Sequence, residues 1–481
     1  MIAAFCESLD KFARANIDAR RIDAAHKIEP SILHGLAELG VFGASIPEEY
    51  GGSELGLEGV CAVVTALARH DRSVATTVGL HLGLGTRGLV AFGSDALKER
   101  WLPDIASGKK LAAFATTEAG AGSDLAAIRT RGMEEDGALV VNGEKIYVTN
   151  GGLADVYTIT ASTPGLGGAR RGHSLLLLER DDVGVKRGAE EDKLGLRGSS
   201  TNTMYFDDAR IPLDRVIGVA GEGMTHLAHV LAWGRTAMAA GCIGSATAAL
   251  EATVAHVAHR QQFGKTLDAF EVVQDQVSEM AATRFAMQAV VHAAATGPRL
   301  LSASTTAKIL CSEGSWDITD MAIQLHGGSG YIEETGIALI LRDARVTRIF
   351  EGANDVLRTH LGLLEATVPA ERARLAGRSP LGAVADALHD TLTELRTDAA
   401  RRFGIKLGRQ QRILHRLGEL ALLRDSCDAV VELASAPDAP SNAMDLASRW
   451  LHVARLRSLA PISEFADASS PVLPLSGVAH A

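Results

Sequence analysis

The chain lacks several features that would assign it to a specialised class. Its 481 residues include five cysteines without a CxxC pair, which indicates reduced thiols rather than a disulfide framework. No basic and apolar leader opens the chain and no apolar run reaches the length of a membrane span, so neither is expected. With 48 basic and 58 acidic residues, the net charge of −10 argues against nucleic acid and anionic membranes as main partners.

Common catalytic and nucleotide-binding fingerprints are missing too. We find no internal repeat, no GxGxxG within a βαβ unit, no Ser-His-Asp set and no cluster of metal ligands. The composition is that of an ordinary globular protein, with 47% apolar and 22% charged residues. We expect a cytoplasmic protein of bacterial type, or a mitochondrial matrix protein if a transit peptide has been removed.

The hydrophobic periodicity predicts an α+β fold, mainly α, in four parts. Residues 1–112 form a helical domain, 113–218 a small β-barrel or sandwich, and 219–367 a bundle of long antiparallel helices. After a Pro/Gly/Arg-rich linker, 382–481 hold about three more helices and a tail, ASSPVLPLSGVAHA, without predicted structure. Within the β-domain, Asn142-Gly143 predicts a type I′ hairpin turn.

The segment 348–358, RIFEGANDVLR, carries the best candidate for a catalytic residue. Glu351 follows the apolar pair Ile349-Phe350, and a lone carboxyl against apolar side chains has a raised pKa and can act as a general base. The residues from Asn354 onward predict a helix start. An acid that only complements a helix N-terminus is the alternative interpretation of Glu351.

Four other stretches have the composition of ligand-binding segments: FATTEAGAGSD (114–124), KIYVTNG (145–151), HRQQFGK (259–265) and QLHGGSGY (324–331). Their glycines permit close backbone approach, and Arg260 suits a diphosphate. Each also has a plain structural interpretation: a turn, a strand or a helix end. The run 79–94 is rich in glycine, which indicates close approach of a ligand or of a second helix. We interpret His326 as structural.

Together these five motifs, in this order, resemble the acyl-CoA dehydrogenase family, with the C-terminal helical extension of its very-long-chain subfamily. The resemblance covers nearly the whole chain. It implies FAD-dependent α,β-dehydrogenation of fatty acyl-CoA thioesters to trans-2-enoyl-CoA, the first step of β-oxidation, with Glu351 as base. Gly85 and Gly88 match two glycines that leave the acyl cavity open in very-long-chain relatives, which implies long acyl chains.

The resemblance also implies site residues and partners. The FAD contacts it implies are Phe114, Thr116, Thr117, Gly122, Ser123, Tyr147, Thr149, Arg260, Phe263, Gln324, Gly327, Gly328, Ala353 and Asp355. The substrate contacts it implies are Ser123, Gly85, Gly88, Arg235 and Gly352, and no metal is implied. An electron-transferring flavoprotein is the implied electron acceptor. A homodimer that shares the FAD site is the implied assembly. Relatives with the extension dock to membranes through the segment that here reads FGIKLGRQQRILHR, but this segment is short and basic with few large apolar residues, so we expect at most weak membrane association.

Several positions depart from the family pattern. Ala119 replaces a proline, Ala353 a threonine and Glu271 a glutamine, whereas Ala232-Trp233 stand where relatives carry the Asp or Asn that holds the pantetheine amide. Gly234, where some relatives place the catalytic glutamate, leaves Glu351 without a competitor. The alternatives are an acyl-CoA oxidase, an acyl-carrier-protein dehydrogenase of a biosynthetic pathway, or a non-catalytic assembly factor with the same fold.

Overall fold

The computed structural model describes residues 1–168, 172–368, 374–376, 379 and 381–466, and it divides the chain into two compact units. The first unit is Met1–Ala353 and the second is Asn354–Ala481. The two units are therefore described separately. Helix α13 (Asn354–Thr367) belongs to the second unit, where it packs on α15, although the sequence pattern had joined residues 354–367 to the bundle. The predicted tail lies outside the described residues.

The first unit begins with short helices whose ends follow local capping rules. Asp18, Asp71 and Ser94 accept backbone N–H groups at the starts of three of them, and Gly40, with φ of 75°, ends α3. The helices are α1 (Ile2–Asn16), α2 (Ala19–Ala25), α3 (Pro30–Glu38), α4 (Gly56–Ala68), α5 (Arg72–Leu80), α6 (Thr86–Phe92) and α7 (Asp95–Ala106).

A π-helical segment, η3 (His81–Gly85), joins α5 to α6 inside the glycine-rich run. A Cβ on Gly85 would lie 3.0 Å from the Ala112 backbone, and the Ala112 N–H donates to His81 Nδ1. Glycine here lets a strand approach the helix closely. Close packing therefore accounts for Gly85.

The β-domain is one eight-stranded sheet. The strands are β1 (Ala112–Ala115), β2 (Arg131–Glu135), β3 (Ala138–Thr149), β4 (Val156–Ser162), β5 (His173–Glu179), β6 (Val185–Glu190), β7 (Thr201–Pro212) and β8 (Val216–Ile217). Their order is β6-β7-β3-β2-β4-β5-β8, with β1 added in parallel to β4. Side chains of β3, β7, β4 and β5 share one apolar core, so the sheet curls around its own interior.

The prediction of a hairpin turn at Asn142-Gly143 is wrong. β3 runs through this dipeptide without turning, and the register against β7 shifts between Val141 and Gly143, as in a β-bulge. The hairpin turn lies instead at Asp136-Gly137, both with positive φ, between β2 and β3. Two dipeptides with turn chemistry stand six residues apart, and the pairing with β2 and β7 decides between them.

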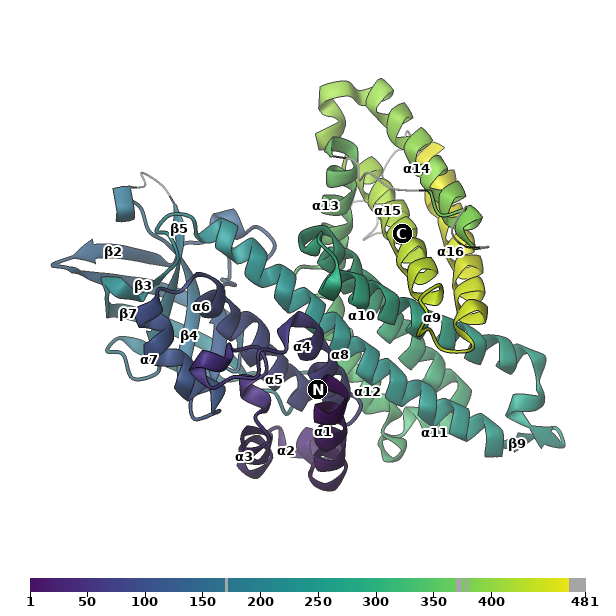
Figure 1. The fold of residues 1–481 in the computed structure, drawn as a ribbon, viewed down its shortest axis with the longest axis horizontal. Coiled ribbons are helices and arrows are strands. Elements are labelled where there is room, and N and C mark those ends of the chain that lie inside the picture. The colour runs from purple at the N-terminus through teal and green to yellow at the C-terminus, as the bar shows by residue number, and fades with distance from the viewer. Residues whose placement is uncertain (169–171, 369–373, 377–378, 380, 467–481) are drawn as a thin grey trace, which may run out of the picture. The chain divides into compact units, whose positions relative to one another are not determined.

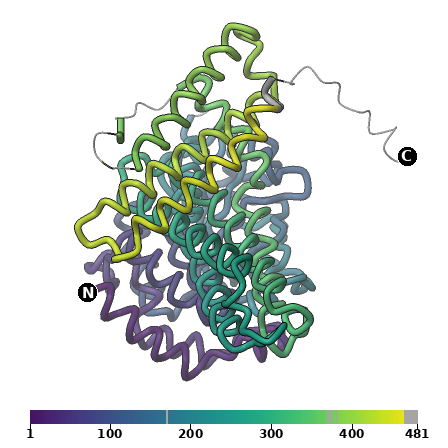
Figure 2. The backbone as a smooth tube through the Cα atoms, turned by 90° about the vertical axis from the view of Figure 1, so that its right-hand side faces the viewer, coloured from purple at the N-terminus to yellow at the C-terminus, as the bar shows by residue number. Residues whose placement is uncertain are grey.

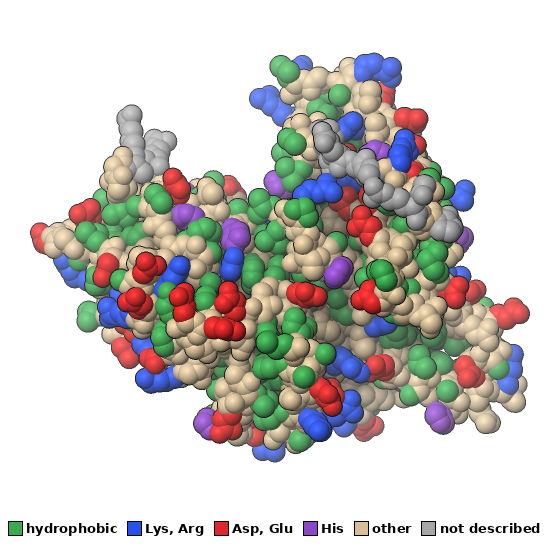
Figure 3. Space-filling model, in the orientation of Figure 1, with side chains coloured by type: hydrophobic (Ala, Val, Ile, Leu, Met, Phe, Trp, Pro, Cys, Tyr) green, Lys and Arg blue, Asp and Glu red, His purple; other side chains and the backbone are tan. Residues whose placement is uncertain are grey.

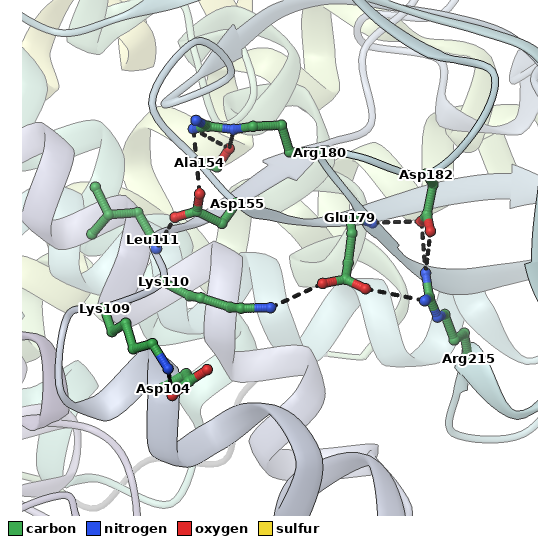
Figure 4. Close-up of polar contacts among 10 residues, drawn as sticks. All are labelled: Asp104, Lys109, Lys110, Leu111, Ala154, Asp155, Glu179, Arg180, Asp182 and Arg215. Atoms are coloured by element: carbon green, nitrogen blue, oxygen red, sulfur yellow. Dashed lines mark hydrogen bonds and ion pairs between the residues drawn. The ribbon is translucent and has the colours of Figure 1, made fainter.

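A polar network fastens the end of α7 to the sheet (Figure 4). Lys110 Nζ lies 2.9 Å from one oxygen of Glu179, and Arg215 lies 3.1 Å from the other. Asp155 accepts the Leu111 N–H at 3.0 Å, directly before β1 begins. These contacts fix the strand that leads into the loop at 114–124.

Long helices complete the first unit: α8 (Gly223–His259), α9 (Glu271–Thr296), α10 (Leu300–His326) and α12 (Ile337–Arg345). α8, α9 and α10 lie side by side in Figures 1 and 2, and α8 packs on both others and on α4. Among the described residues, α8 alone has the length and composition of a membrane span, but 72% of that window is buried within the protein. Burial in the bundle accounts for its apolar composition.

The second unit is a set of helices packed around α15 (Gln411–Ala434). α13, α14 (Gly382–Phe403) and α16 (Ala443–Ala466) contact it, and α14, α15 and α16 lie in the region where the sequence predicts about three helices. Glycines bring α13 and α15 together, because a Cβ on Gly362 would collide with Leu414 O and one on Gly418 with Arg358 O. The buried Glu365 pairs with Arg424 at 2.8 Å across the same interface.

We expect Gly418→Ala to destabilise the second unit by about 1–3 kcal/mol, because the added methyl group overpacks the α13–α15 crossing. Thermal unfolding followed by circular dichroism measures the change. Gly408→Ala is the matched control, since a Cβ there meets only Leu363 Cδ1 at 3.9 Å. Equal melting temperatures for both variants would contradict the close crossing.

Candidate active site

Glu351 lies on a turn that the sequence places between two helical segments. The short helical turn Val346–Arg348 ends before it, and Glu351 and Gly352 both have positive φ, 55° and 104°. A left-handed conformation at a glutamate is uncommon and is strained. Two cations on the neighbouring helices α8 and α10 hold the turn. Arg235 Nε donates to the Glu351 carbonyl at 2.9 Å, and Lys308 Nζ donates to the Gly352 carbonyl at 2.8 Å.

The Glu351 carboxyl is buried over a gap that Gly234 creates on α8. A Cβ at Gly234 would collide with Leu84 and would lie 3.2 Å from Glu351 Oε2. Oε2 is buried and has no hydrogen-bond partner among the described residues. A buried acceptor without a partner is costly, which indicates that a ligand group completes this site.

Burial raises the pKa of Glu351 from the ordinary value of 4.5 to about 7, and Arg235, Lys308 and Arg72 oppose that rise. Burial likewise lowers the pKa of Lys308 to about 8, against the nearby Glu351 charge. A carboxyl with a pKa near neutrality is half ionised at physiological pH. It therefore has the protonation behaviour of a general base.

The loop at 114–124 and the strand at 145–149 form a second group of candidate residues. Phe114 is buried on β1, Thr116 Oγ1 donates to Thr160 Oγ1 at 3.1 Å, and Ile146 N–H donates to the Thr117 carbonyl at 2.9 Å. Gly122 and Ser123 are exposed at the tip of the loop.

A β-bulge turns Tyr147 outward. The register of β3 against β7 shifts between Lys145 and Val148, and Tyr147 has φ of 56°. The Tyr147 side chain is 65% exposed, Val148 beside it is buried, and Thr149 is half-buried. An aromatic ring thus lies on the open side of the strand, next to the loop.

A buried ion pair joins the loop to the strand. Lys145 Nζ donates to Glu118 Oε1 at 2.7 Å and to the Thr116 carbonyl at 3.0 Å, and Glu118 also accepts the N–H groups of Arg129 and Thr130. These bonds hold the pKa of the Glu118 carboxyl at about 2 against its burial. The pair sets the shape of the loop.

A third group lies at the far ends of α8 and α10. Arg260 is exposed directly after α8, and Phe263 is 93% exposed in the hairpin between β9 (Gln261–Gln262) and β10 (Lys265–Thr266). The ring of His326, near the end of α10, stacks on His256 with centroids 4.2 Å apart. This contact accords with a structural role for His326.

The remaining positions of the third group are open. Gln324 is exposed, as are Gly327 and Gly328, and a Cβ on either glycine would meet nothing within 4 Å. Ala353 is half-buried at the end of the first unit, and Asp355 is exposed at the start of α13.

Sequence reasoning found Glu351 and Arg235 but missed Lys308 and Arg72. Lys308 is a single cation in the apolar stretch TTAKILC of α10 and is fully buried, which was a usable signal. Arg72 is buried beside Gly241, where a side chain on that glycine would collide with its guanidinium. Nothing in the sequence near Arg72 indicates that burial.

The sequence is similar to those of known proteins. The sequence matches the models of the acyl-CoA dehydrogenase N-terminal domain over residues 2–109, middle domain over 113–209 and C-terminal domain over 221–363. The rat mitochondrial very long-chain specific acyl-CoA dehydrogenase (Rattus norvegicus) is 34% identical over 84% of this chain and 64% of its own length. A probable acyl-CoA dehydrogenase of Mycobacterium tuberculosis is 35% identical over 71% of this chain and 88% of its own.

The fold is also similar to those of solved structures. An acyl-CoA dehydrogenase of Bacillus anthracis complexed with FAD aligns with a TM-score of 0.87 at 25% identity, covering 99% of this chain and 90% of that one. Butyryl-CoA dehydrogenase from Megasphaera elsdenii aligns with a TM-score of 0.71 at 32% identity, over 74% and 95%. The chain belongs to the acyl-CoA dehydrogenase family. It spans between 54 and 66% of the length of its mammalian very long-chain relatives.

The raised pKa of Glu351 predicts a pH-dependent stability. Because the folded pKa, about 7, exceeds 4.5, the contribution of Glu351 is fully present below pH 4.5 and is lost as pH rises through 7. Glutamine cannot ionise. We therefore expect the melting temperature of Glu351→Gln, relative to wild type, to rise between about pH 5 and about pH 8.

Differential scanning fluorimetry across this pH range measures the effect. Glu279→Gln, an exposed position on α9, is the control and should give a constant difference. A constant difference for Glu351→Gln as well would show that its carboxyl is not destabilised by burial.

Proposed function

We propose that this protein is an FAD-dependent acyl-CoA dehydrogenase that converts fatty acyl thioesters into trans-2-enoyl thioesters, as in the first step of β-oxidation. The observation that carries the proposal is the buried carboxyl of Glu351, with its unpaired Oε2 and a pKa near 7. Membership of the acyl-CoA dehydrogenase family supports the same reaction.

In this reaction Glu351 takes the proton from the α-carbon of the thioester. Its raised pKa matches a base that works near neutral pH. Arg235 and Lys308 hold the turn through its carbonyl oxygens, which leaves the carboxylate free to face the substrate. Among the described backbone hydrogen bonds none uses the Glu351 N–H, and we assign it to the thioester oxygen, whose negative charge grows as the proton leaves.

The candidate residues fit an FAD. A Cβ on Gly120 or Gly122 would meet nothing within 4 Å, so this loop has room for a ligand against its backbone, and Tyr147 exposes its ring beside it. When bound, FAD would accept the hydride that leaves the β-carbon. Thr116, Thr117, Thr149 and Ser123 would hold the flavin end, and Arg260, Phe263 and the Gln324–Gly328 segment would hold the adenosine end.

Long acyl chains are the proposed substrates. A Cβ on Gly88 would find Leu175, Thr158 and Val230 between 3.6 and 3.7 Å away, at ordinary contact distance. The wall beside Gly88 is therefore mostly apolar and leaves a methyl-sized space. Each further methylene that is buried would contribute about 0.8 kcal/mol to binding.

An electron-transferring flavoprotein is the proposed acceptor, which reduction of the purified acceptor by substrate-loaded protein would test. At most weak membrane association is proposed, because in the Gly404–Arg409 segment Ile405 is fully exposed beside Lys406 and Arg409. A single exposed apolar side chain with a few basic residues gives reversible binding. Flotation with anionic liposomes that survives high salt would contradict it.

Replacing the base tests the reaction. We expect Glu351→Gln to keep its FAD, because the side chain is nearly isosteric, and to reduce the flavin with acyl-CoA about 10²–10⁴-fold more slowly. Anaerobic stopped-flow absorbance measures the rate. A yellow Gln variant that reduces at the wild-type rate would place the base elsewhere, and a wild-type protein that acyl-CoA never bleaches would favour the assembly-factor alternative.

Substituting Gly88 tests the chain length. We expect Gly88→Gln to lose activity on chains of roughly twelve carbons and longer while keeping activity on shorter ones, because the amide would fill the space beside Leu175. Gly88→Ala is the matched control and should retain long-chain activity. An equal loss on all chain lengths, with a lower melting temperature, would show that Gly88 serves helix packing.

Assembly gives a further test. We expect a homodimer, because the exposed Arg260 and Phe263 group and the Gln324–Gly328 segment would bind FAD from a second subunit. Light scattering of the FAD-loaded protein measures the mass. A monomer that retains stoichiometric FAD would refute the shared site. The C-terminal helices resemble those that replace a second dimer in very-long-chain relatives, and a tetramer would refute only that role.

A further inference from the structure

A guanidinium without a carboxylate partner lies between α6 and α8. Arg87 is half-buried, its Nε and Nη2 lie 3.3 and 3.1 Å from His229 Nε2, and its Cζ stands 4.0 Å from the centre of the Trp233 ring. In the part of the chain that the structure describes, no acidic side chain pairs with Arg87. Cations that are removed from water are normally paired with an anion. Because no described carboxylate pairs with Arg87, the charge of its half-buried guanidinium is available to a ligand.

Trp233 supplies an independent observation. Its side chain is more than nine-tenths buried, yet the indole Nε1 has no hydrogen-bond partner among the described residues. Indole nitrogen only donates, so an acceptor must come from elsewhere. The adjacent ring atom Cδ1 would lie 3.8 Å from a Cβ on Gly83, and the absence of a side chain at Gly83 leaves this edge uncovered.

Trp233 precedes Gly234 on α8, and Gly234 is the residue that faces the base. A Cβ on Gly83 would lie 3.7 Å from Gly234 Cα, and a Cβ on Gly234 would lie 3.2 Å from Glu351 Oε2. Arg87 follows Gly83 by four residues on the same helical run, a rise of about 6 Å. A substrate with its α-carbon at Glu351 would therefore pass within reach of this long side chain.

His229 adds to the donor character of the group. Its Nε2 faces the guanidinium and so accepts, which leaves Nδ1 to carry the proton. Its ring also packs against Phe92, with centroids 5.4 Å apart. Guanidinium, indole and imidazole thus present only donors to the space beside them, and a fork of N–H groups matches a carboxylate or a phosphate.

We propose that Arg87, Trp233 and His229 form a subsite that binds an anionic oxygen group of the substrate. The inference rests on the proposed function and specifies its substrate further. Two parts of an acyl thioester can bring such a group: a carboxylate at the distal end of the acyl chain, or a phosphate of the thiol carrier. Both use the same donors.

Three thioesters of one chain length distinguish the sources: palmitoyl-CoA, hexadecanedioyl-CoA, which adds a distal carboxylate, and S-palmitoyl-pantetheine, which lacks the phosphates. Dissociation constants come from calorimetry and KM and kcat from flavin reduction, for wild type, Arg87→Gln and Trp233→Phe. The Phe variant removes the indole N–H and keeps a smaller aromatic ring under Arg87. Arg100→Gln, an exposed arginine over Trp101, is the matched control.

We expect Arg87→Gln to weaken binding about tenfold or more, the effect of losing a charged hydrogen bond, and to raise KM more than it lowers kcat. A loss for hexadecanedioyl-CoA alone assigns the chain carboxylate. A loss for both CoA esters, but not for S-palmitoyl-pantetheine, assigns the carrier phosphate. Trp233→Phe should weaken the same substrates by a smaller factor, and Arg100→Gln should change none.

An equal effect of Arg87→Gln on all three thioesters, or no effect on any, would overturn the subsite. Either result would leave the proposed reaction intact, provided that wild-type flavin is bleached by at least one of the thioesters. Wild-type flavin that none of them bleaches would instead refute the reaction.

Discussion

The site depends on the burial of one carboxyl group on a strained turn. Glu351 holds a left-handed backbone conformation, and its carboxyl lies over Gly234 without a hydrogen bond to one oxygen. Both features cost free energy, and neither would persist without support. The support comes from Arg235 and Lys308, which bond to carbonyl oxygens rather than to the carboxylate. The cations therefore hold the turn, and burial keeps the pKa near neutral.

The rest of the first unit positions partners around this turn. η3 contacts β1 through Gly85 and contacts α8 through Leu84, so one irregular helical segment links the sheet to the bundle. Irregular helix geometry of this kind is frequent at functional sites. The Glu118–Lys145 ion pair makes a second link, because it joins the glycine-rich loop at 114–124 to the bulged strand that carries Tyr147.

Much of this could be predicted from the sequence, because the strongest signals are local. The positions of the long helices, the α-β-α order and the pKa direction of Glu351 follow from periodicity and from its apolar neighbours. The Asn142-Gly143 turn failed because pairing with β7 overrides local turn chemistry. The burial of Lys308 had a local signal, a single cation in an apolar stretch, whereas Arg72 and the Arg87–Trp233 contact depend on helices distant in sequence, which no local pattern encodes. The division after Ala353 likewise rests on a distant contact, because α13 packs on α15, more than forty residues later.

The division after Ala353 bears on how the catalytic carboxyl group is held in position. The peptide that carries Glu351 also leads from the first compact unit into the second, since the first unit ends only two residues beyond the base. If this turn were loose, any displacement of the backbone after Ala353 would also displace the base. The hydrogen bonds from Arg235 to the Glu351 carbonyl and from Lys308 to the Gly352 carbonyl hold two successive peptide units of the turn in place. They fix the backbone just before it leaves the first unit, so the position of the proton acceptor is set by contacts within that unit.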